Sequence, residues 1–509
     1  MFLVMTCVTQ VLASDALDSN AAVSWSTSSD GFPDLPGLPD PIGFAGPFVG
    51  VVGDQLLVAG GANFPGGRPW DGHEKVWHDR IFLLSWNEQQ NAPASAWRKL
   101  EKDRLPRPLG YGVSLTIKHQ GENAVLCIGG CDAGKHSDQV FLLTWNGKQV
   151  ETVKGPSLPR PCAYFCGAVL DDEIFVAGGR EQPDSPTALK TFWSLKIDDL
   201  QKKDAAWTER DPWPGRGRML AVAGAQAGRF YLFSGTDLVP GENGGPKREY
   251  LTDCYSWSRA KGWKRVADIP RPCVAAPTPA PAAGQSHLLV LGGDDGKHAA
   301  EVEKLKDAHP GFPNEIMGYH TITDTWRPIG EMIKDVGDDP GGDPNSGVWP
   351  PVTTNTTSWR GRIVVASGEV RPGVRTPRVL WAERTPNTLS LSALDYSVIF
   401  VYLAALVMMG VYFSRRENTT DDFFLGGRRI PWWAAGMSIF GTQLSAITFM
   451  AIPAMVYRTN WVYFLMNMTI VAAAPVVVWM YLPFYRRLNV TTAYEYLELR
   501  FDPATRMVG

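Results

Sequence analysis

The stretch L-L-V-A-G-G at residues 56–61 is a short apolar run that ends in a glycine doublet, and this pattern decides the fold because the chain repeats it. A Gly-Gly or Ser-Gly pair closes a similar apolar run at five later points, which begin at Gly129, Gly178, Ser234, Gly292 and Ser367. Counted from Gly60, the successive intervals are 69, 49, 56, 58 and 75 residues. A period in this range indicates an array of similar structural units.

The remainder of each repeat fits a blade of four antiparallel strands. Downstream of three doublets a second apolar run ends at a tryptophan, at Trp86, Trp145 and Trp257. The motif L-P-R-P or I-P-R-P then introduces the next repeat, at Leu105, Leu158 and Ile269. Six such blades around one axis predict an all-β propeller. We interpret the doublets as close-packing positions of inner strands, since no G-x-x-x-x-G-K-[ST] phosphate loop is present.

Composition excludes some functions. The net charge is -3 and no long basic stretch occurs, so the sequence gives no reason to expect a nucleic-acid partner. The seven cysteines lack paired C-x-x-C spacing, which favours structural thiols or disulfides over zinc ligands.

Near Asp395 the chain changes from soluble to membrane character. The segments 396–413, 432–457 and 461–482 contain no charged residue, and the shortest has 18 residues. That is about the minimum length of a helix that crosses the ~30 Å hydrocarbon layer. We therefore predict three α-helical transmembrane spans after the propeller, with a linker at 386–394.

Charges near these spans predict the orientation. Arginines are retained on the cytoplasmic side of a membrane. They follow the first and third spans, whereas the joint between the second and third has only Arg458; the others are Arg415, Arg416, Arg428, Arg429, Arg486, Arg487 and Arg500. We expect a multi-pass protein of the inner (plasma) membrane with the propeller on the periplasmic or extracellular side. Residues 1–14 resemble an apolar secretory leader, although they lack a positive start.

The repeats over 32–385 resemble the kelch family, and the last blade narrows the resemblance. Its segment G-E-V-R-P-G-V-R-T at 368–376 is similar to the part of bacterial N-acetylneuraminate epimerases, the sialic acid mutarotases, that carries their essential Glu and Arg. By position these residues are Glu369 and Arg375. The first blade adds A-G-G-A-N-F-P-G-G at 59–67 and a polar insertion, as in that family. Shorter insertions in the middle blades leave the identity of the sugar open.

The chemistry of anomer exchange explains this pair of residues. Opening a cyclic keto-sugar acid requires removal of the proton on the anomeric hydroxyl and protonation of the ring oxygen. A carboxylate such as Glu369 can remove and return the proton. The planar guanidinium of Arg375 suits a substrate carboxylate. The alternative is a structural ion pair that braces the turn at Pro372 and Gly373.

The polar insertion of the first blade supplies further candidates. Arg68 and Asp71 are predicted to contact substrate hydroxyls. His73, Glu74 and His78 suggest a metal cluster at first sight, but a polar loop over a sugar pocket explains them better. We expect no metal and no cofactor in the propeller.

The membrane part resembles the sodium:solute symporter family over 395–509, on the joint at 414–433, the polar second span and T-T-A-Y-E-Y-L-E-L-R-F at 491–501. The small and polar residues of the second span must line a cavity or pack against protein. In a LeuT-type transporter this first core helix is discontinuous. The resemblance implies Na⁺ coordination by the carbonyls of Gly441 and Leu444, with Gln443, Ser445 and Thr448 near the substrate. Helix packing is the alternative for each side chain.

Together the two modules predict anomer exchange of N-acetylneuraminate or a similar sugar acid, coupled to Na⁺-dependent uptake. Symporters of this family have well over ten spans, so we expect that this chain is a fragment or that the rest of the transporter is supplied separately. The expected partners are the sugar acid, the lipid bilayer and that remainder. One alternative is a non-catalytic kelch sugar-binding or sensor module attached to a symporter; another is a scaffold for protein partners.

Overall fold

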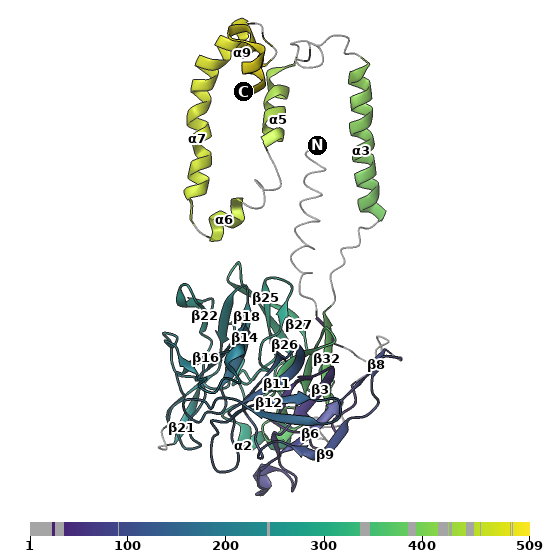
Figure 1. Cartoon of the computed structure of the whole chain (residues 1–509), viewed down its shortest axis with the longest axis vertical. Coiled ribbons are helices and arrows are strands. Elements are labelled where there is room, and N and C mark those ends of the chain that lie inside the picture. Colours follow the sequence, from purple (N-terminus) through teal and green to yellow (C-terminus); the bar gives the residue numbers. More distant parts are fainter. Residues whose placement is uncertain are drawn as a thin grey trace. The chain divides into compact units, whose positions relative to one another are not determined.

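The computed structural model describes residues 23–25, 35–89, 91–241, 245–335, 347–384, 393–415, 426, 430–443, 452–458, 460–488, 490 and 492–508. The chain forms two compact units, Met1–Asn387 and Thr388–Gly509. Strands form the first unit and helices the second (Figure 1). The predicted leader at 1–14 lies outside the described residues, as do residues 386–392 of the predicted linker.

The predicted six-bladed propeller is confirmed, because the described part of the first unit contains six four-stranded antiparallel sheets. The first blade is β2 (Phe48–Val52), β3 (Gln55–Ala59), β6 (Arg80–Leu84) and β9 (Arg98–Arg104). The second is β10 (Val113–His119), β11 (Glu122–Ile128), β12 (Val140–Trp145) and β13 (Val150–Lys154), and the third is β14 (Cys166–Leu170), β15 (Glu173–Ala177), β16 (Phe192–Lys196) and β17 (Thr208–Glu209).

The second half of the propeller repeats this order. The fourth blade is β18 (Val222–Gln226), β19 (Arg229–Phe233), β22 (Cys254–Ser258) and β23 (Gly262–Val266), and the fifth is β24 (Ala282–Ala283), β25 (His287–Leu291), β26 (Glu315–His320) and β27 (Thr325–Glu331). The sixth is β28 (Thr356–Trp359), β29 (Arg362–Ala366), β32 (Val379–Arg384) and β1 (Val23–Trp25).

The sixth blade combines the two ends of the propeller sequence. Its outermost strand is β1, which pairs antiparallel with β32 so that Val23 lies opposite Arg384 and Trp25 opposite Ala382. The innermost strand, β28, lies against β2 of the first blade. This arrangement closes the ring of blades and covers an edge of β32 that would otherwise be open to pairing with another chain.

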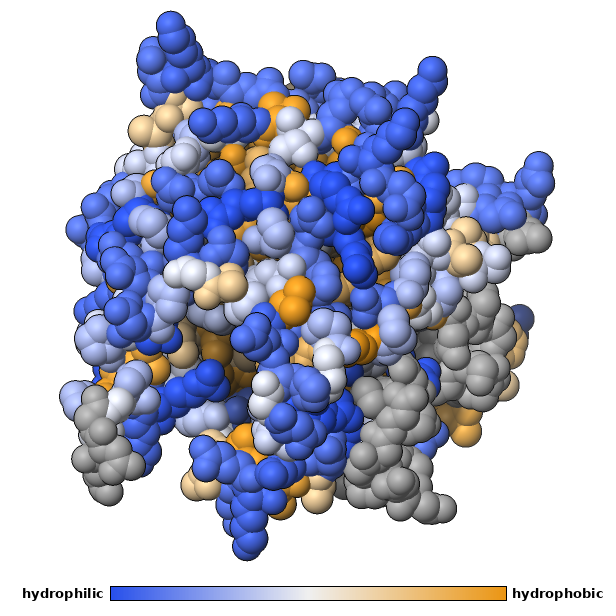
Figure 2. Space-filling view, turned by 90° about the horizontal axis from the view of Figure 1, so that it is seen from below, coloured by the Kyte–Doolittle hydropathy of each residue, from blue (hydrophilic) through white to orange (hydrophobic). Residues whose placement is uncertain are grey.

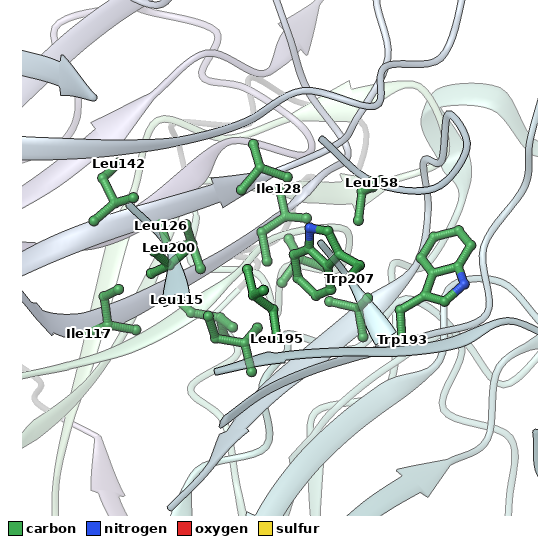
Figure 3. Close-up of a cluster of buried hydrophobic side chains, with 14 of the residues drawn as sticks. Leu115, Ile117, Leu126, Ile128, Leu142, Leu158, Trp193, Leu195, Leu200 and Trp207 are labelled. Atoms are coloured by element: carbon green, nitrogen blue, oxygen red, sulfur yellow. The ribbon is translucent and has the colours of Figure 1, made fainter. Parts of the chain in front are cut away.

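Apolar side chains fill the space between neighbouring blades. Between the second and third blades, Leu115 and Leu126 pack with Trp193 and Leu195 in one buried cluster (Figure 3). Each buried side chain of this size contributes about 1.5–3 kcal/mol relative to full exposure. The six described cysteines are free thiols and all are buried, so they belong to this core.

The second unit contains helices where spans are predicted. The described helices are α3 (Ala393–Ser414), α5 (Trp432–Gln443), α6 (Ile452–Arg458), α7 (Val462–Val476), α8 (Leu482–Leu488), α9 (Ala493–Arg500) and α10 (Pro503–Val508), and the π-helical segment η7 (Val477–Tyr481) joins α7 to α8. By length and composition, Ala393–Ser414 and Val462–Leu488 are able to cross a membrane. Residues 444–451 lie outside the described residues, so a span at 432–457 stays a prediction.

Candidate functional site

A closed ring of backbone hydrogen bonds surrounds the propeller axis. Each blade contributes one residue just before its inner strand, and the amide of that residue donates to the carbonyl of the corresponding residue in the preceding blade. The six donor-acceptor pairs are Tyr111–Gly46 (2.8 Å), Tyr164–Tyr111 (2.9 Å), Leu220–Tyr164 (2.7 Å), Ala275–Leu220 (2.8 Å), Thr353–Ala275 (2.7 Å) and Gly46–Thr353 (2.7 Å). We call these six residues the axial ring.

All six residues of the axial ring have a left-handed backbone. Their φ angles lie between 54° and 64°, and only Gly46 is a glycine. A non-glycine residue in this region costs roughly 1–2 kcal/mol, and such strain persists only where the surroundings over-determine the conformation. Because the six hydrogen bonds form a closed cycle, no single member can relax without opening it.

The axial ring forms the floor of a large cavity. Five of its residues, all except Gly46, line a cavity of about 1100 Å³, together with loop residues from every blade except the second. On the other side of the ring, a smaller cavity of about 40 Å³ is lined by residues that follow the ring positions, such as Gly112 and Ala221. Val302 of α2 (Val302–Leu305) lines the large cavity. Figure 2 views the propeller from the end that carries α2 and shows a mostly hydrophilic face with apolar side chains recessed in a hollow.

A second repeated backbone contact lies next to the axial ring. The residue directly after each doublet forms a backbone bridge to the residue just before the axial ring, as in Ala163–Arg180, Val274–Asp294 and Val352–Glu369. Three of these post-doublet residues, Arg180, Asp294 and Glu369, line the cavity. Glu369 therefore occupies a repeat position from which side chains reach the cavity.

Glu369 and Arg375 lie opposite each other in a short hairpin. β30 (Glu369–Arg371) pairs with β31 (Val374–Arg375), and Glu369 is the register partner of Arg375. The Gly373 amide in the turn donates to Glu369 Oε1 at 2.7 Å. Arg375 Nη1 lies 3.5 Å from the same oxygen. The turn amide thus holds the carboxylate through Oε1, and Glu369 lines the cavity.

Arg375 is a buried cation with an unpaired donor. Its side chain is 4% exposed and its guanidinium carbon lies 4.7 Å from the centre of the Phe64 ring. Burial opposes the charged form, but the Glu369 carboxylate and the phenol of Tyr111 outweigh it and raise the pKa of Arg375. Among the described residues, none accepts a hydrogen bond from Nε. Buried donors are normally paired, so this atom is suited to an anionic ligand.

Other cavity residues were not predicted from the sequence. Lys75 Nζ lies 4.1 Å from the centre of the Tyr111 ring and 4.9 Å from that of Trp77. On another part of the wall, Tyr250 Oη donates to Asp294 Oδ2 at 2.6 Å. Asp294 could have been found from its place directly after a doublet, where Glu369 also lies.

The predicted substrate contacts of the first blade lie elsewhere. Arg68 Nε pairs with Asp307 Oδ1 at 3.0 Å, and Asp71 is exposed in the 3₁₀-helix η2 (Pro69–Asp71). Neither residue lines the 1100 Å³ cavity, so their contact with substrate stays a prediction. His78 Nε2 contacts Asn63 Oδ1 at 2.8 Å. The described residues contain no cluster of three or more His, Cys, Asp or Glu that could hold a metal ion.

The predicted sodium and substrate path falls partly outside the described residues. Gly441 and Gln443 lie in the last turn of α5. Leu444, Ser445 and Thr448 lie outside the described residues. The role of all five stays a prediction.

Comparisons with known proteins match the two parts separately. The model of the N-acetylneuraminate epimerase family matches residues 8–152, and that of the sodium:solute symporter family matches residues 423–508. The chain joins a region similar to N-acetylneuraminate epimerases to a region similar to sodium:solute symporters. The epimerase match covers the first two blades and does not reach the Glu369–Arg375 hairpin.

Individual relatives agree with this division. The sodium/sialic acid symporter SiaT of Proteus mirabilis is 51% identical over 114 residues, which are 22% of this chain and 23% of the relative. The N-acetylneuraminate epimerase of Brucella melitensis is 35% identical over 139 residues, which are 25% of this chain and 32% of the relative. The solved structure of YjhT aligns over 69% of this chain and 98% of its own, with 14% identity and a TM-score of 0.47. The chain thus spans less than a third of each of these two sequence relatives.

Proposed function

We propose that the propeller interconverts the anomers of N-acetylneuraminate or a closely related sugar acid. The observation that carries this proposal is the Glu369–Arg375 hairpin on the wall of the 1100 Å³ cavity, with a fixed carboxylate and an unpaired buried guanidinium N–H. In this proposal Glu369 moves the proton of the anomeric hydroxyl, and Arg375 binds the substrate carboxylate.

The charge of the cavity supports an anionic substrate. The described residues that line it include five Lys or Arg and three Asp or Glu, namely Lys75, Arg180, Lys247, Arg248, Arg375, Asp294, Glu303 and Glu369. A cleft lined by an excess of one sign raises the local concentration of ligands of the opposite sign. A sugar acid fits this lining better than a neutral sugar.

The enzyme is tested with the full chain in lipid nanodiscs. One anomer of N-acetylneuraminate is added, and NMR follows its relaxation to the equilibrium mixture. We expect catalysed relaxation by the wild type and a loss of about 10²–10⁴-fold in Glu369→Gln. Glu101→Gln, on the outer strand β9, is the matched control and should keep wild-type activity. Relaxation no faster than the buffer rate in the wild type refutes the proposal. Tight binding without faster relaxation would favour the sugar-binding or sensor alternative.

We also propose that the membrane part belongs to a sodium-coupled uptake system and that the propeller lies on its extracytoplasmic side. The arginines after the first and third apolar segments support this orientation, and Gly441, Gln443, Leu444, Ser445 and Thr448 are the proposed ion and substrate path. Lys148→Cys would place an exposed thiol on the propeller, whose described native cysteines are buried. A membrane-impermeant maleimide should label this variant in intact cells. Labelling only after lysis would contradict the orientation.

A further inference from the structure

Anomer exchange needs two proton transfers, and Glu369 accounts for one of them. When the carboxylate removes the proton of the anomeric hydroxyl, the ring oxygen must gain a proton as its bond to the anomeric carbon breaks. A second group with an available proton should therefore reach the same part of the cavity.

Tyr111 has a buried hydroxyl whose proton has no acceptor among the described residues. The residue is 6% exposed and lines the cavity as a member of the axial ring. Its oxygen lies beside the Arg375 guanidinium, which can only donate to it, and among the described residues none accepts the phenol proton. The other two cavity-lining tyrosines differ, because Tyr164 Oη contacts Cys131 Sγ at 3.7 Å and Tyr250 Oη donates to Asp294. Tyr250 already donates its proton to Asp294, and of the other two phenols only that of Tyr111 forms a side-chain hydrogen bond with Arg375, the partner of Glu369.

The axial ring brings Tyr111 and Glu369 to the two sides of Gly46. Gly46 bonds to Tyr111 on one side and to Thr353 on the other. A Cβ at Gly46 would lie 2.7 Å from Tyr111 Cδ1, so the Tyr111 ring lies over this glycine. Val352, just before Thr353, exchanges two backbone hydrogen bonds of 2.8 Å with Glu369. Both Tyr111 and Glu369 interact with the Arg375 guanidinium, which places the two groups on the same part of the cavity wall.

Two cations stabilise negative charge at this point. Lys75 Nζ lies 4.1 Å from the centre of the Tyr111 ring. The attraction between this ammonium group and the ring strengthens when the phenol becomes a phenolate. Arg375 interacts electrostatically with both Glu369 and Tyr111. A negative charge that moves from the carboxylate to the phenol thus stays beside the same guanidinium, which limits the electrostatic cost of the transfer.

We propose that Tyr111 is the general acid that protonates the ring oxygen, with Glu369 as the general base; this role rests on the proposed anomer exchange. Glu369 takes the anomeric hydroxyl proton, the electron pair of the broken O–H bond forms the second bond of the carbonyl, and the bond from the anomeric carbon to the ring oxygen breaks with its electron pair leaving on the ring oxygen. The ring oxygen takes the Tyr111 proton. After rotation presents the other carbonyl face, the sugar hydroxyl attacks it and returns its proton to the phenolate, while Glu369 returns its proton to the carbonyl oxygen. Atoms and charges balance over the cycle.

The first test is Tyr111→Phe in the full chain in nanodiscs, assayed by the NMR relaxation of N-acetylneuraminate. We expect kcat to fall by about 10²–10³-fold, within the range of general acid catalysis, while KM changes less than about threefold. Thermal stability should change little, because the phenol proton has no acceptor among the described residues and Arg375 keeps its contact with Glu369. Tyr319→Phe is the control: it removes a buried hydroxyl that donates to Asp324, remote from the cavity lining, and should leave kcat unchanged.

A second measurement keeps the test decisive if the Phe variant does not fold. Tyr111 is replaced by a fluorotyrosine, which keeps the hydroxyl and lowers its pKa. We expect the basic limb of the kcat profile to move to lower pH, a change that a purely structural hydroxyl would not produce. Unchanged kcat in Tyr111→Phe, an effect on KM alone, or an unmoved basic limb would overturn the role of Tyr111. If one of these outcomes occurs while the wild type is active and Glu369→Gln is inactive, it overturns the role of Tyr111 and leaves the proposed function standing. An inactive wild type overturns the proposed function as well.

Discussion

Gly46→Ala adds one methyl group to the axial ring, at the floor of the cavity. Gly46 has φ +64°, and a Cβ there would lie 2.6 Å from the Tyr111 amide nitrogen and 2.7 Å from Tyr111 Cδ1. That nitrogen donates to the Gly46 carbonyl, so the new methyl group presses on the hydrogen bond that joins the first two blades. Gly262 is a matched site, because it also has φ +64° and a Cβ there would meet nothing within 4 Å.

The two substitutions separate backbone strain from steric conflict. Alanine at φ +64° costs about 1–2 kcal/mol at either site. At Gly46 the clash must also displace Tyr111 or its neighbours, which weakens one or two ring hydrogen bonds worth about 0.5–1.5 kcal/mol each. The floor of the cavity is well packed, so some contact energy is lost as well. We expect Gly46→Ala to lower the free energy of unfolding by about 3–5 kcal/mol and Gly262→Ala by about 1–2 kcal/mol.

Urea unfolding followed by tryptophan fluorescence measures both variants in the full chain. A difference below about 0.5 kcal/mol between them would refute the claim that the closed axial ring is rigid at Gly46. Gly46→Ala should also reduce turnover per folded molecule, because it moves Tyr111. Gly262→Ala should not, because Gly262 begins the outer strand β23.

Three further predictions follow from the buried charges, histidines and thiols. Arg218 is fully buried and donates to Asp253 Oδ2 at 2.7 Å and to the Ser234 carbonyl at 2.8 Å. Arg218→Met should cost about 3–5 kcal/mol in urea unfolding, because it leaves the Asp253 carboxylate without its cation and with the Tyr255 hydroxyl as donor; Asp253→Asn in the same chain should recover part of this loss. Burial lowers the folded-state pKa of five histidines from 6.5, namely His78, His136, His287, His309 and His320. The unfolded chain therefore binds more protons than the folded chain, so the free energy of unfolding should be constant above about pH 7 and fall as the pH drops below 6.5. A urea midpoint that stays flat between pH 7 and pH 5 would contradict this. Burial raises the pKa of the Cys166 thiol to about 12, and the described cysteines should react with a thiol reagent only as fast as the propeller unfolds.

The blades were predictable because their signal is local. Each doublet ends an apolar run of one strand, and the residue types themselves mark the turn at the axis, as at Gly60 and Gly61 with φ of 66° and 84°. The closure of the last blade was not predicted. β1 has three residues and pairs with β32 at the other end of the propeller sequence. No local pattern in Val23–Trp25 indicates that β32 is its partner.

Of the candidate site, only the part marked by a sequence motif could be predicted. The segment around Glu369 and Arg375 has a recognisable sequence, and the hairpin indeed brings the two residues together. The axial ring has no such sequence, since its members are Gly, Tyr, Tyr, Leu, Ala and Thr. What they share is a positive φ, which residue type reveals only for glycine. Tyr111 was missed for this reason, and Lys75 because its contact with Tyr111 joins two blades.

The axial ring links the stability of the propeller to its proposed chemistry. Five non-glycine residues hold a left-handed backbone there, and at roughly 1–2 kcal/mol each this strain requires that all six blades be in place. The same hydrogen bonds set the relative positions of Tyr111 and Thr353, and the neighbour of Thr353, Val352, bonds to Glu369. An opening of the ring at any blade would therefore move the proposed acid and base apart before the blade cores unfold. Activity should be lost at lower urea concentration than tryptophan burial, and the gap between the two transitions should be widest in variants of the ring residues.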